Sequence, residues 1–313
     1  MMESVNTFGR AAGVIAVGGY APVGILTNAD IERMVDTSDE WIRSRSGIAT
    51  RHIARADEAL SDMLEIAAKQ ALERANFAPE DLDAIIVASV TGDSPLPSTA
   101  CIIQHRLGAV NAMAFDVAAA CTGSLYALVL ASSLITAGQC RHVLVLGGEL
   151  LSKVVDYTDR TLCPLLGDAA GAMLVAPVEA GFGLLTSYLR ADGSGAEFVK
   201  IPAGGSRLPA TCETVLAREH YMRMNGREVF KFAVRAIEDA AKAVFARSGY
   251  TAEDIALVVP HQANIRIINS AIERINIPAE RWFMNLEDYG NTGAGSIPFA
   301  LNQAFEEGRL HKG

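Results

Sequence analysis

The segment from Ala118 to Gly138 reads AAACTGSLYALVLASSLITAG, and the predicted fold is organised around it. From Thr122 to Ala137 nearly every residue is apolar or small, which predicts a helix buried on all sides. The apolar segment just before it, AVNAMAFDVAAA, predicts a buried strand that ends in a tight turn. Cys121 therefore lies where a strand leads into the first turn of a central helix.

This position makes Cys121 a candidate nucleophile. At the start of a helix, unpaired backbone N–H groups and the positive end of the helix dipole both favour a thiolate. The alternative is an inert buried cysteine, which is a common environment for this residue. The segment alone leaves both interpretations open.

Length and composition exclude several classes of protein. The chain has 313 residues, enough for two domains or for two halves that share a layered core. Its net charge of −9 argues against a nucleic-acid partner. Five cysteines without a CxxC pair favour a reduced, cytoplasmic chain over a disulfide scaffold or a zinc site. The sequence has neither a signal peptide nor an uncharged segment of bilayer length, so we expect no membrane partner.

Two pairs of similar segments indicate an internal repeat. FAPEDLDAIIVASVT, from Phe77, resembles YTAEDIALVVPHQAN, which begins 173 residues later. CTGSLYALVLASSLITAG, from Cys121, resembles NTGAGSIPFALNQAFEEG, which begins 170 residues later at Asn291. Matches in the same order at nearly constant separation predict an α/β fold made of two duplicated βαβ-rich halves, residues 1–178 and 179–313.

The repeat has a chemical consequence. If the halves pack about a pseudo-twofold axis, Cys121 and Asn291 both start central helices and face each other. His261 follows the predicted strand IALVVP, and functional sites in α/β folds often lie at the ends of strands. A nucleophile, a base and an amide donor would thus converge. After Gly308 only RLHKG follows, so we expect the chain to end before the strands that would complete its second half.

A second candidate site lies in the segment DTSDEWIRSRSGI. Trp41 and Arg45 are four residues apart, so they share one face of a predicted helical turn. An aromatic plane beside a guanidinium suits an adenine or a phosphate. A tryptophan half-covered by a surface arginine is the alternative interpretation.

Several motifs in a fixed order resemble those of one family. They are TNADIERMVDTSDEWIRSRSGI, PSTACIIQ, AACTGSLYAL, GDAAGAM, MNGREVFKFAV, PHQANIRI and YGNTGAGSIP. With these motifs the chain resembles the β-ketoacyl-acyl-carrier-protein synthase III family, which has the thiolase fold and starts type II fatty acid synthesis. The resemblance implies a layered α-β-α-β-α core and a homodimer in which the strand near Phe115 pairs across the interface.

The resemblance also implies an activity and its substrates. The reaction is a decarboxylative Claisen condensation of an acyl-CoA primer with malonyl-acyl carrier protein. No cofactor is implied apart from these two thioester substrates. The implied catalytic residues are Cys121, His261 and Asn291. The implied coenzyme A contacts are Trp41 and Arg160 at the adenine, Arg45 near the phosphates and Asn264 along the pantetheine tunnel.

The sequence departs from the family pattern at three places. Leu96 and Leu166 stand where family members often carry phenylalanine beside the acyl pocket, which predicts that acyl groups larger than acetyl are accepted. Ala169 replaces a glycine, which would strain a turn that needs a positive φ. The glycine-rich strand pair that ends family members is absent, so half of the oxyanion hole would be missing.

The acidic carrier protein is expected to dock on the predicted helix from Gly226 to Ser248. Three basic residues spaced by four, Arg227, Lys231 and Arg235, form one stripe on this helix. Arg266, five residues after His261, extends the stripe toward the tunnel. A solvated charged face is the alternative. Two other functions stay open as well. One is a related acyltransferase or starter condensing enzyme of secondary metabolism, and the other is a non-catalytic homologue that only binds acyl carriers or CoA.

Overall fold

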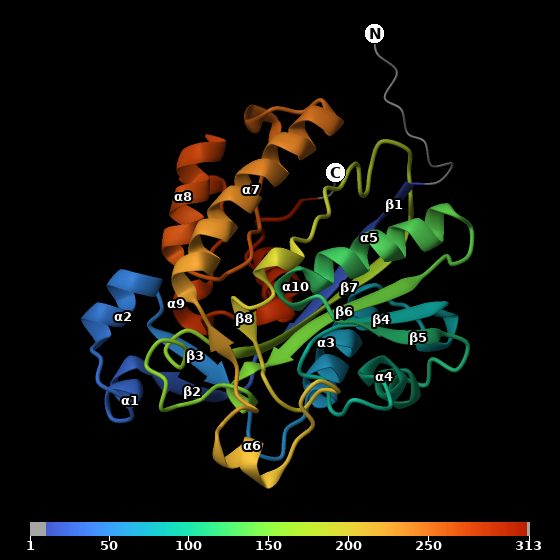
Figure 1. Cartoon of the computed structure of the whole chain (residues 1–313). Helices are drawn as coiled ribbons and strands as arrows, with labels where there is room; N and C mark the ends of the chain where they lie inside the picture. The colour runs from blue at the N-terminus through green and yellow to red at the C-terminus, as the bar shows by residue number, and fades with distance from the viewer. Residues whose placement is uncertain (1–10, 312–313) are drawn as a thin grey trace.

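A five-stranded sheet forms the centre of the molecule in the computed structural model, which describes residues 11–311 (Figure 1). Its strand order is β1-β7-β6-β4-β5. The strands are β1 (Ala11–Tyr20), β4 (Ala84–Ala88), β5 (Met113–Val117), β6 (Val143–Leu150) and β7 (Asp168–Val178). β4 runs parallel to β5 and β6, whereas β7 runs antiparallel to β1 and β6. The carboxyl ends of β4, β5 and β6 therefore meet at one edge of the sheet.

Helices cover both faces of this sheet. α3 (Leu60–Arg74) and α4 (Thr99–Leu107) pack on one face, and α5 (Gly123–Thr136) and α10 (Ser296–Glu306) pack on the other. Each face has its own apolar core. Every residue of β4 and β6 is buried, as expected for parallel strands that are covered on both sides.

The other elements lie around this three-layer core. Near the start of the chain β2 (Gly24–Thr27) pairs with β3 (Thr50–Ile53). α1 (Asn28–Glu32) and α2 (Asp39–Ser46) lie between these two strands in the sequence. β8 (Val199–Lys200) and β9 (Arg223–Met224) form another small pair, and α6 (Cys212–Leu216) lies between them in the sequence. The second half adds α7 (Gly226–Ser248), α8 (Ile265–Ile275) and α9 (Leu286–Tyr289), and α7 packs along α8 (Figure 1). None of the helices within residues 11–311 is long and apolar enough to cross a bilayer.

The internal repeat is visible in the structure. In each half a 3-10 turn precedes the long helix at the repeat position, Ala120–Thr122 before α5 and Gly293–Gly295 before α10. Both helices end at a glycine with positive φ, +73° at Gly138 and +68° at Gly308, a conformation that glycine adopts without strain. The two repeat copies contact each other where these 3-10 turns pack together.

The second half lacks a counterpart of the five-stranded sheet among residues 11–311. The segment IALVVP, predicted as a strand, contributes only a one-residue bridge between Val258 and Trp282. Its repeat mate β4 is a strand because β5 and β6 pair with it on both sides. The segment around Val258 has no such neighbours, so the second β layer is reduced to this bridge.

Two local expectations were wrong. α5 is not buried on all sides, since Leu125 and Leu130 are 38% and 37% exposed on the face opposite the sheet. Its small residues, such as Ala127 and Ala131, make the contacts with the sheet, and an apolar pattern does not reveal which face has a cover. Ala169 causes no turn strain, because it lies inside β7 opposite Glu149 and has no positive φ.

Close packing of α10 on β7 depends on Gly171. A Cβ atom at Gly171 would lie 2.4 Å from the backbone nitrogen of Phe299 and 2.5 Å from the carbonyl carbon of Pro298. Gly171→Ala should therefore push α10 away and lower the free energy of unfolding by about 1–3 kcal/mol. Urea unfolding measures this loss, provided that the dependence of the unfolding free energy on urea concentration is the same in both proteins. Gly193→Ala is the matched control, because its Cβ would meet nothing within 4 Å. An equal loss in both variants would contradict the packing argument.

Candidate active site

Cys121 lies in the sharp turn between β5 and α5. Ala120, just before it, has φ +46°, a conformation that costs energy for a residue with a Cβ atom. Cys121 is partly exposed. Thr122, the N-cap residue of α5, makes no side-chain capping bond. The Thr122 N–H donates to the Ala119 carbonyl at 3.3 Å, and the Gly123 N–H donates to the Ala120 carbonyl, so backbone carbonyls already satisfy these two groups.

Desolvation favours the thiol form of Cys121. Burial raises its pKa to about 11, and the nearby Glu149 carboxylate adds to this increase. The backbone at the helix start lowers the pKa of the thiol, as expected, but desolvation of the sulfur raises it more.

Asn291 is held at both its backbone and its side chain. Its N–H donates to the Leu165 carbonyl at 2.8 Å, and its carbonyl accepts from the Gly167 N–H at 3.0 Å. Its Oδ1 accepts from the Gly293 N–H at 3.0 Å. Its Nδ2 donates to no other atom of residues 11–311, so this amide is an oriented donor without a protein partner.

His261 lies on a loop that its neighbour Gln262 fixes. The buried Gln262 donates its backbone N–H to Ser296 Oγ at 2.8 Å, and its Oε1 accepts from the Asn285 N–H at 3.2 Å. His261 Nδ1 is buried without a hydrogen-bond partner in the described part of the chain. Burial lowers the pKa of His261 to about 4, so the ring is neutral at pH 7.

The segments that carry these three residues meet at the starts of α5 and α10. Ser124 Oγ donates to the Ala294 carbonyl at 2.7 Å, and these two residues are 170 positions apart, the repeat separation. Ser124 follows Cys121 by three residues, and Ala294 follows Asn291 by three. The Gln262 bond to Ser296 brings the His261 loop to the same place. The two 3-10 turns also pack against each other.

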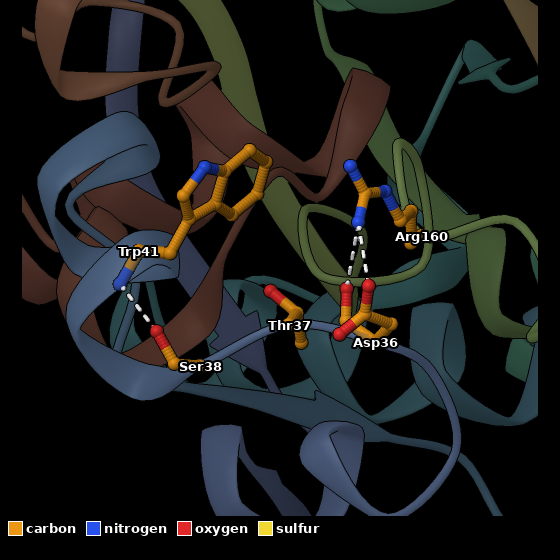
Figure 2. A pocket seen from close by; sticks show the side chains of 5 residues that line it. All are labelled: Asp36, Thr37, Ser38, Trp41 and Arg160. Carbon is orange, nitrogen blue, oxygen red and sulfur yellow. Dashed lines mark hydrogen bonds and ion pairs between the residues drawn. The ribbon is translucent and has the colours of Figure 1, made fainter.

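A surface pocket of about 370 Å³ contains two of the residues expected to bind coenzyme A. Trp41 and Arg160 line it together with Asp36, Thr37 and Ser38, which sequence reasoning did not single out. Figure 2 shows Trp41 and Arg160 on opposite sides of the opening, with the Asp36–Ser38 segment between them. Arg160 donates to the Asp36 carboxylate at 3.2 Å and to its carbonyl at 3.1 Å.

Arg45 and Asn264 are joined by a hydrogen bond. Asn264 caps α8, with its Oδ1 accepting from the Arg266 N–H at 2.9 Å. Its Nδ2 donates to the Arg45 carbonyl at 3.1 Å, which ties α8 to α2. The Arg45 side chain is exposed. Asn264 thus connects the helix that follows His261 with the helix that carries Trp41.

The two leucines expected at the acyl pocket do not lie together. Leu166 is buried and forms a one-residue bridge with Asn291. Leu96 is 86% exposed on the loop before α4. The expectation that both leucines line the acyl pocket stays a prediction, because one side chain belongs to the core of the single chain and the other projects from its surface.

The expected docking residues share one surface on α7 and α8. Arg227, Lys231 and Arg235 are all exposed. Lys231 pairs with Glu228 at 2.7 Å. The Arg266 guanidinium lies 5.5 Å from the ring centre of Phe230, which brings it beside the α7 stripe.

Two residues of this region escaped sequence reasoning. Gln262 holds the His261 loop, and Glu149 lies at the carboxyl end of β6 beside the turn that follows Asn291. Both are buried polar residues near the end of an apolar segment: Gln262 follows IALVVP and His261, and Glu149 follows VLVLGG. A polar residue at the end of an apolar segment is the sequence signal that could have identified both residues.

Comparisons with known proteins agree with this arrangement. Residues 115–193 match the family model for 3-oxoacyl-(acyl-carrier-protein) synthase III, and residues 245–313 match the model for its C-terminal part. The chain is 51% identical over 303 residues to the β-ketoacyl-(acyl-carrier-protein) synthase III of Caldanaerobacter subterraneus, covering 97% of this chain and 92% of the relative.

Solved structures give the same result. The crystal structure of the synthase III from Aquifex aeolicus is 45% identical with a TM-score of 0.88, covering 96% of this chain and 93% of that one. The enzyme from Thermus thermophilus is 43% identical with a TM-score of 0.89, covering 96% and 92%. The expected thiolase-type α/β fold is confirmed. The chain belongs to the 3-oxoacyl-(acyl-carrier-protein) synthase III family.

Proposed function

We propose that this chain condenses an acyl-CoA primer with malonyl-acyl carrier protein in a decarboxylative Claisen reaction, with Cys121 as its nucleophile. Family membership makes the chain an acyltransferase of the condensing type. The observation that carries the residue assignment is the 2.7 Å bond from Ser124 to the Ala294 carbonyl. This bond joins the two repeat copies at the helix starts that carry Cys121 and Asn291.

In the first stage the Cys121 sulfur attacks the carbonyl carbon of the acyl-CoA thioester. The thiol proton is lost as the bond between sulfur and carbon forms, and the Cys121 N–H stabilises the oxyanion. The bond to the CoA sulfur then breaks, and the proton passes to that sulfur. An acyl-enzyme and free CoA result.

In the second stage the malonyl thioester loses CO₂. The electron pair of the broken C–C bond forms an enolate, and the His261 N–H and Asn291 Nδ2 donate to its oxygen. Neither donor carries a full charge, because burial keeps His261 neutral, so the enolate is stabilised without being protonated. The enolate carbon attacks the acyl-enzyme, and the Cys121 sulfur leaves and regains a proton.

Coenzyme A is proposed to bind at the surface pocket of Trp41 and Arg160, with Arg45 near its phosphates and Asn264 along the pantetheine. The ion pair between Arg160 and Asp36 is exposed on both sides and therefore weak, so Arg160 can exchange Asp36 for a ligand. The bond from Asn264 to the Arg45 carbonyl supports a continuous path from this pocket to the His261 loop.

The proposed compartment is the cytoplasm. All five cysteines are free thiols, which is typical of a reducing compartment. We propose no cofactor apart from the thioester substrates.

The alternative role in secondary metabolism is not favoured, because relatives that are 51% identical are named β-ketoacyl-(acyl-carrier-protein) synthase III. The segments that carry the Cys121 thiol, the His261 imidazole and the Asn291 amide meet in one region. This argues against a homologue that only binds acyl carriers or CoA.

Removing individual groups should separate the two stages. Cys121→Ser should abolish acyl-enzyme formation, because a hydroxyl is a poor nucleophile at neutral pH. His261→Ala and Asn291→Ala should each slow malonyl decarboxylation by about two to three orders of magnitude and slow acyl transfer less. Mass spectrometry of the acylated protein and release of labelled CO₂ measure the two stages. Acyl transfer by Cys121→Ser at a near-normal rate would refute the nucleophile.

The chain is proposed to form a homodimer through the free edge of β5. This strand ends the sheet, and the apolar residues on or near it, Met113 and Val110, are exposed. Sedimentation at micromolar concentration should give about twice the chain mass of 33.2 kDa. Met113→Lys with Val110→Lys should give monomers, whereas Leu216→Lys, at an exposed leucine elsewhere, should not. Unmodified protein that sediments as a monomer would contradict the proposal.

The carrier protein is proposed to dock on the α7 stripe with Arg266. An acidic partner gains association rate from a basic patch, and this gain should fall as salt rises. Lys231→Glu with Arg235→Glu should raise the KM for malonyl-carrier and leave acyl-CoA priming almost unchanged. The matched control is Lys69→Glu with Arg55→Glu, which changes the net charge equally at two exposed sites away from α7 and α8. If both double variants behave alike, the carrier binds elsewhere.

A further inference from the structure

Arg51 is a buried arginine outside the candidate catalytic and coenzyme A residues. It lies in β3, is 0% exposed and is the largest of the fully buried side chains among residues 11–311. Its four hydrogen bonds within these residues all go to uncharged oxygens. A buried guanidinium without an acidic partner is costly, so its presence here calls for a role.

The guanidinium of Arg51 joins two segments that are far apart in the sequence. Its Nη1 donates to the Leu26 carbonyl at 3.1 Å and to Asn28 Oδ1 at 2.9 Å. Its Nη2 donates to Asn28 Oδ1 at 2.9 Å and to the Pro164 carbonyl at 2.5 Å. The rigid, planar fork of donors therefore fixes Pro164 relative to the end of β2 and the start of α1.

The segment that begins at Pro164 holds the backbone of Asn291. The Leu165 carbonyl accepts from the Asn291 N–H at 2.8 Å, and the Gly167 N–H donates to the Asn291 carbonyl at 3.0 Å. Leu166, between them, forms a one-residue bridge with Asn291. Pro164 directly precedes Leu165, so a shift of the Pro164 carbonyl would disturb both bonds to Asn291.

The stem of Arg51 supports the same place by packing. A Cβ atom at Gly167 would lie 3.1 Å from Arg51 Cβ, and one at Gly290 would lie 3.5 Å from it. Gly290 directly precedes Asn291, and Gly167 is its hydrogen-bond partner. The Arg51 stem thus lies against residues on both sides of the Asn291 backbone.

The neighbours of Arg51 in β3 hold the chain just before Gly290. Thr50 Oγ1 donates to the Asp288 carbonyl at 2.8 Å. The His52 ring stacks on the Tyr289 ring, with 4.6 Å between the ring centres. β3 therefore contacts the approach to Asn291 at three successive residues.

We propose that Arg51 is a positioning residue for Asn291. Its guanidinium fixes the Pro164 carbonyl, its stem supports Gly167 and Gly290, and together these contacts set the direction of the Asn291 amide. The proposal rests on Asn291 donating to the enolate, as in the proposed function.

The effect of Arg51 should be confined to the stage that uses Asn291. Arg51 also contacts Asn28, which leads to α2 and the coenzyme A pocket. Asn28 has bonds of its own, however, because its Nδ2 donates to Asp39 Oδ1 at 2.7 Å and to the Ile48 carbonyl at 2.8 Å. α2 therefore stays attached when the Arg51 donors are removed.

Arg51→Met tests this separation of the stages, because it keeps the length of the side chain and removes its donors. Mass spectrometry of acylated Cys121 measures acyl transfer from acetyl-CoA or isobutyryl-CoA, and release of labelled CO₂ from malonyl-acyl carrier protein measures decarboxylation. Decarboxylation should slow by about tenfold to a hundredfold, because a shift of about 1 Å in a positioned group has an effect of this size. Acyl transfer should be almost unchanged. An equal loss in both stages would overturn the proposal.

A double variant shows whether Arg51 acts through Asn291. In an Asn291→Ala background, Arg51→Met should slow decarboxylation by no more than about twofold further, because the amide that it positions is already gone. A merely structural residue would lower the rate by the same factor with and without the Asn291 amide. That result would overturn the proposal.

Two further variants serve as control and replacement. Arg74 also joins distant segments, donating to the Val17 carbonyl at 2.8 Å and to Asn302 Oδ1, so Arg74→Met is the matched control and should not separate the two stages. Arg51→Lys keeps the charge but replaces the fork by a single ammonium group. It should reproduce the loss of decarboxylation and takes the place of Arg51→Met if that variant does not fold.

Hydrogen exchange tests the contact without catalysis. In the Arg51 variants the peptides that contain the Gly167 and Asn291 N–H groups should exchange faster than in the unmodified protein, whereas Arg74→Met should leave them unchanged. Unchanged exchange in the Arg51 variants would overturn the proposal. If Asn291→Ala decarboxylates at the normal rate, the enolate role in the proposed function fails. The exchange rates then still decide whether Arg51 holds Asn291.

Discussion

The close approach of the Asn291 turn to the central sheet is the constraint on which the rest of the structure depends. A Cβ atom at Gly295 would lie 2.3 Å from the Ala169 carbonyl, and one at Gly147 would lie 2.5 Å from the Ala294 carbonyl. Only glycine leaves room for two backbones this near. The contact allows Ser124 to bond to Ala294, and through it the two halves share one candidate catalytic region.

Desolvation dominates the electrostatics of that region. Burial raises the pKa of the Cys121 thiol and the Glu149 carboxyl and lowers the pKa of His261, so each group shifts toward its neutral form. A site made of neutral groups suits a reaction in which negative charge develops on the substrate. The same burial means that a change in one charge is strongly felt by its neighbours.

The sequence predicted elements that carry their own local signals. The helix from Gly226 to Ser248 has the predicted bounds, because Asn225 caps its start and Gly249 ends it with φ +75°. The strand predicted around Val258 did not form a ladder, because a strand exists only with a paired neighbour. Which face of a helix is buried likewise depends on the elements that pack against it, as the exposed Leu125 of α5 demonstrates.

By itself the sequence determined the family, the α/β repeat and the candidates Cys121, His261 and Asn291, because motif order and a constant separation of 170 residues are written along the chain. Only the tertiary structure decided the protonation of these groups and the exposure of Leu96. It alone also revealed Glu149 as a neighbour of the Asn291 turn. The physical reason is that desolvation and contact depend on atoms brought together from distant segments, which no local pattern records.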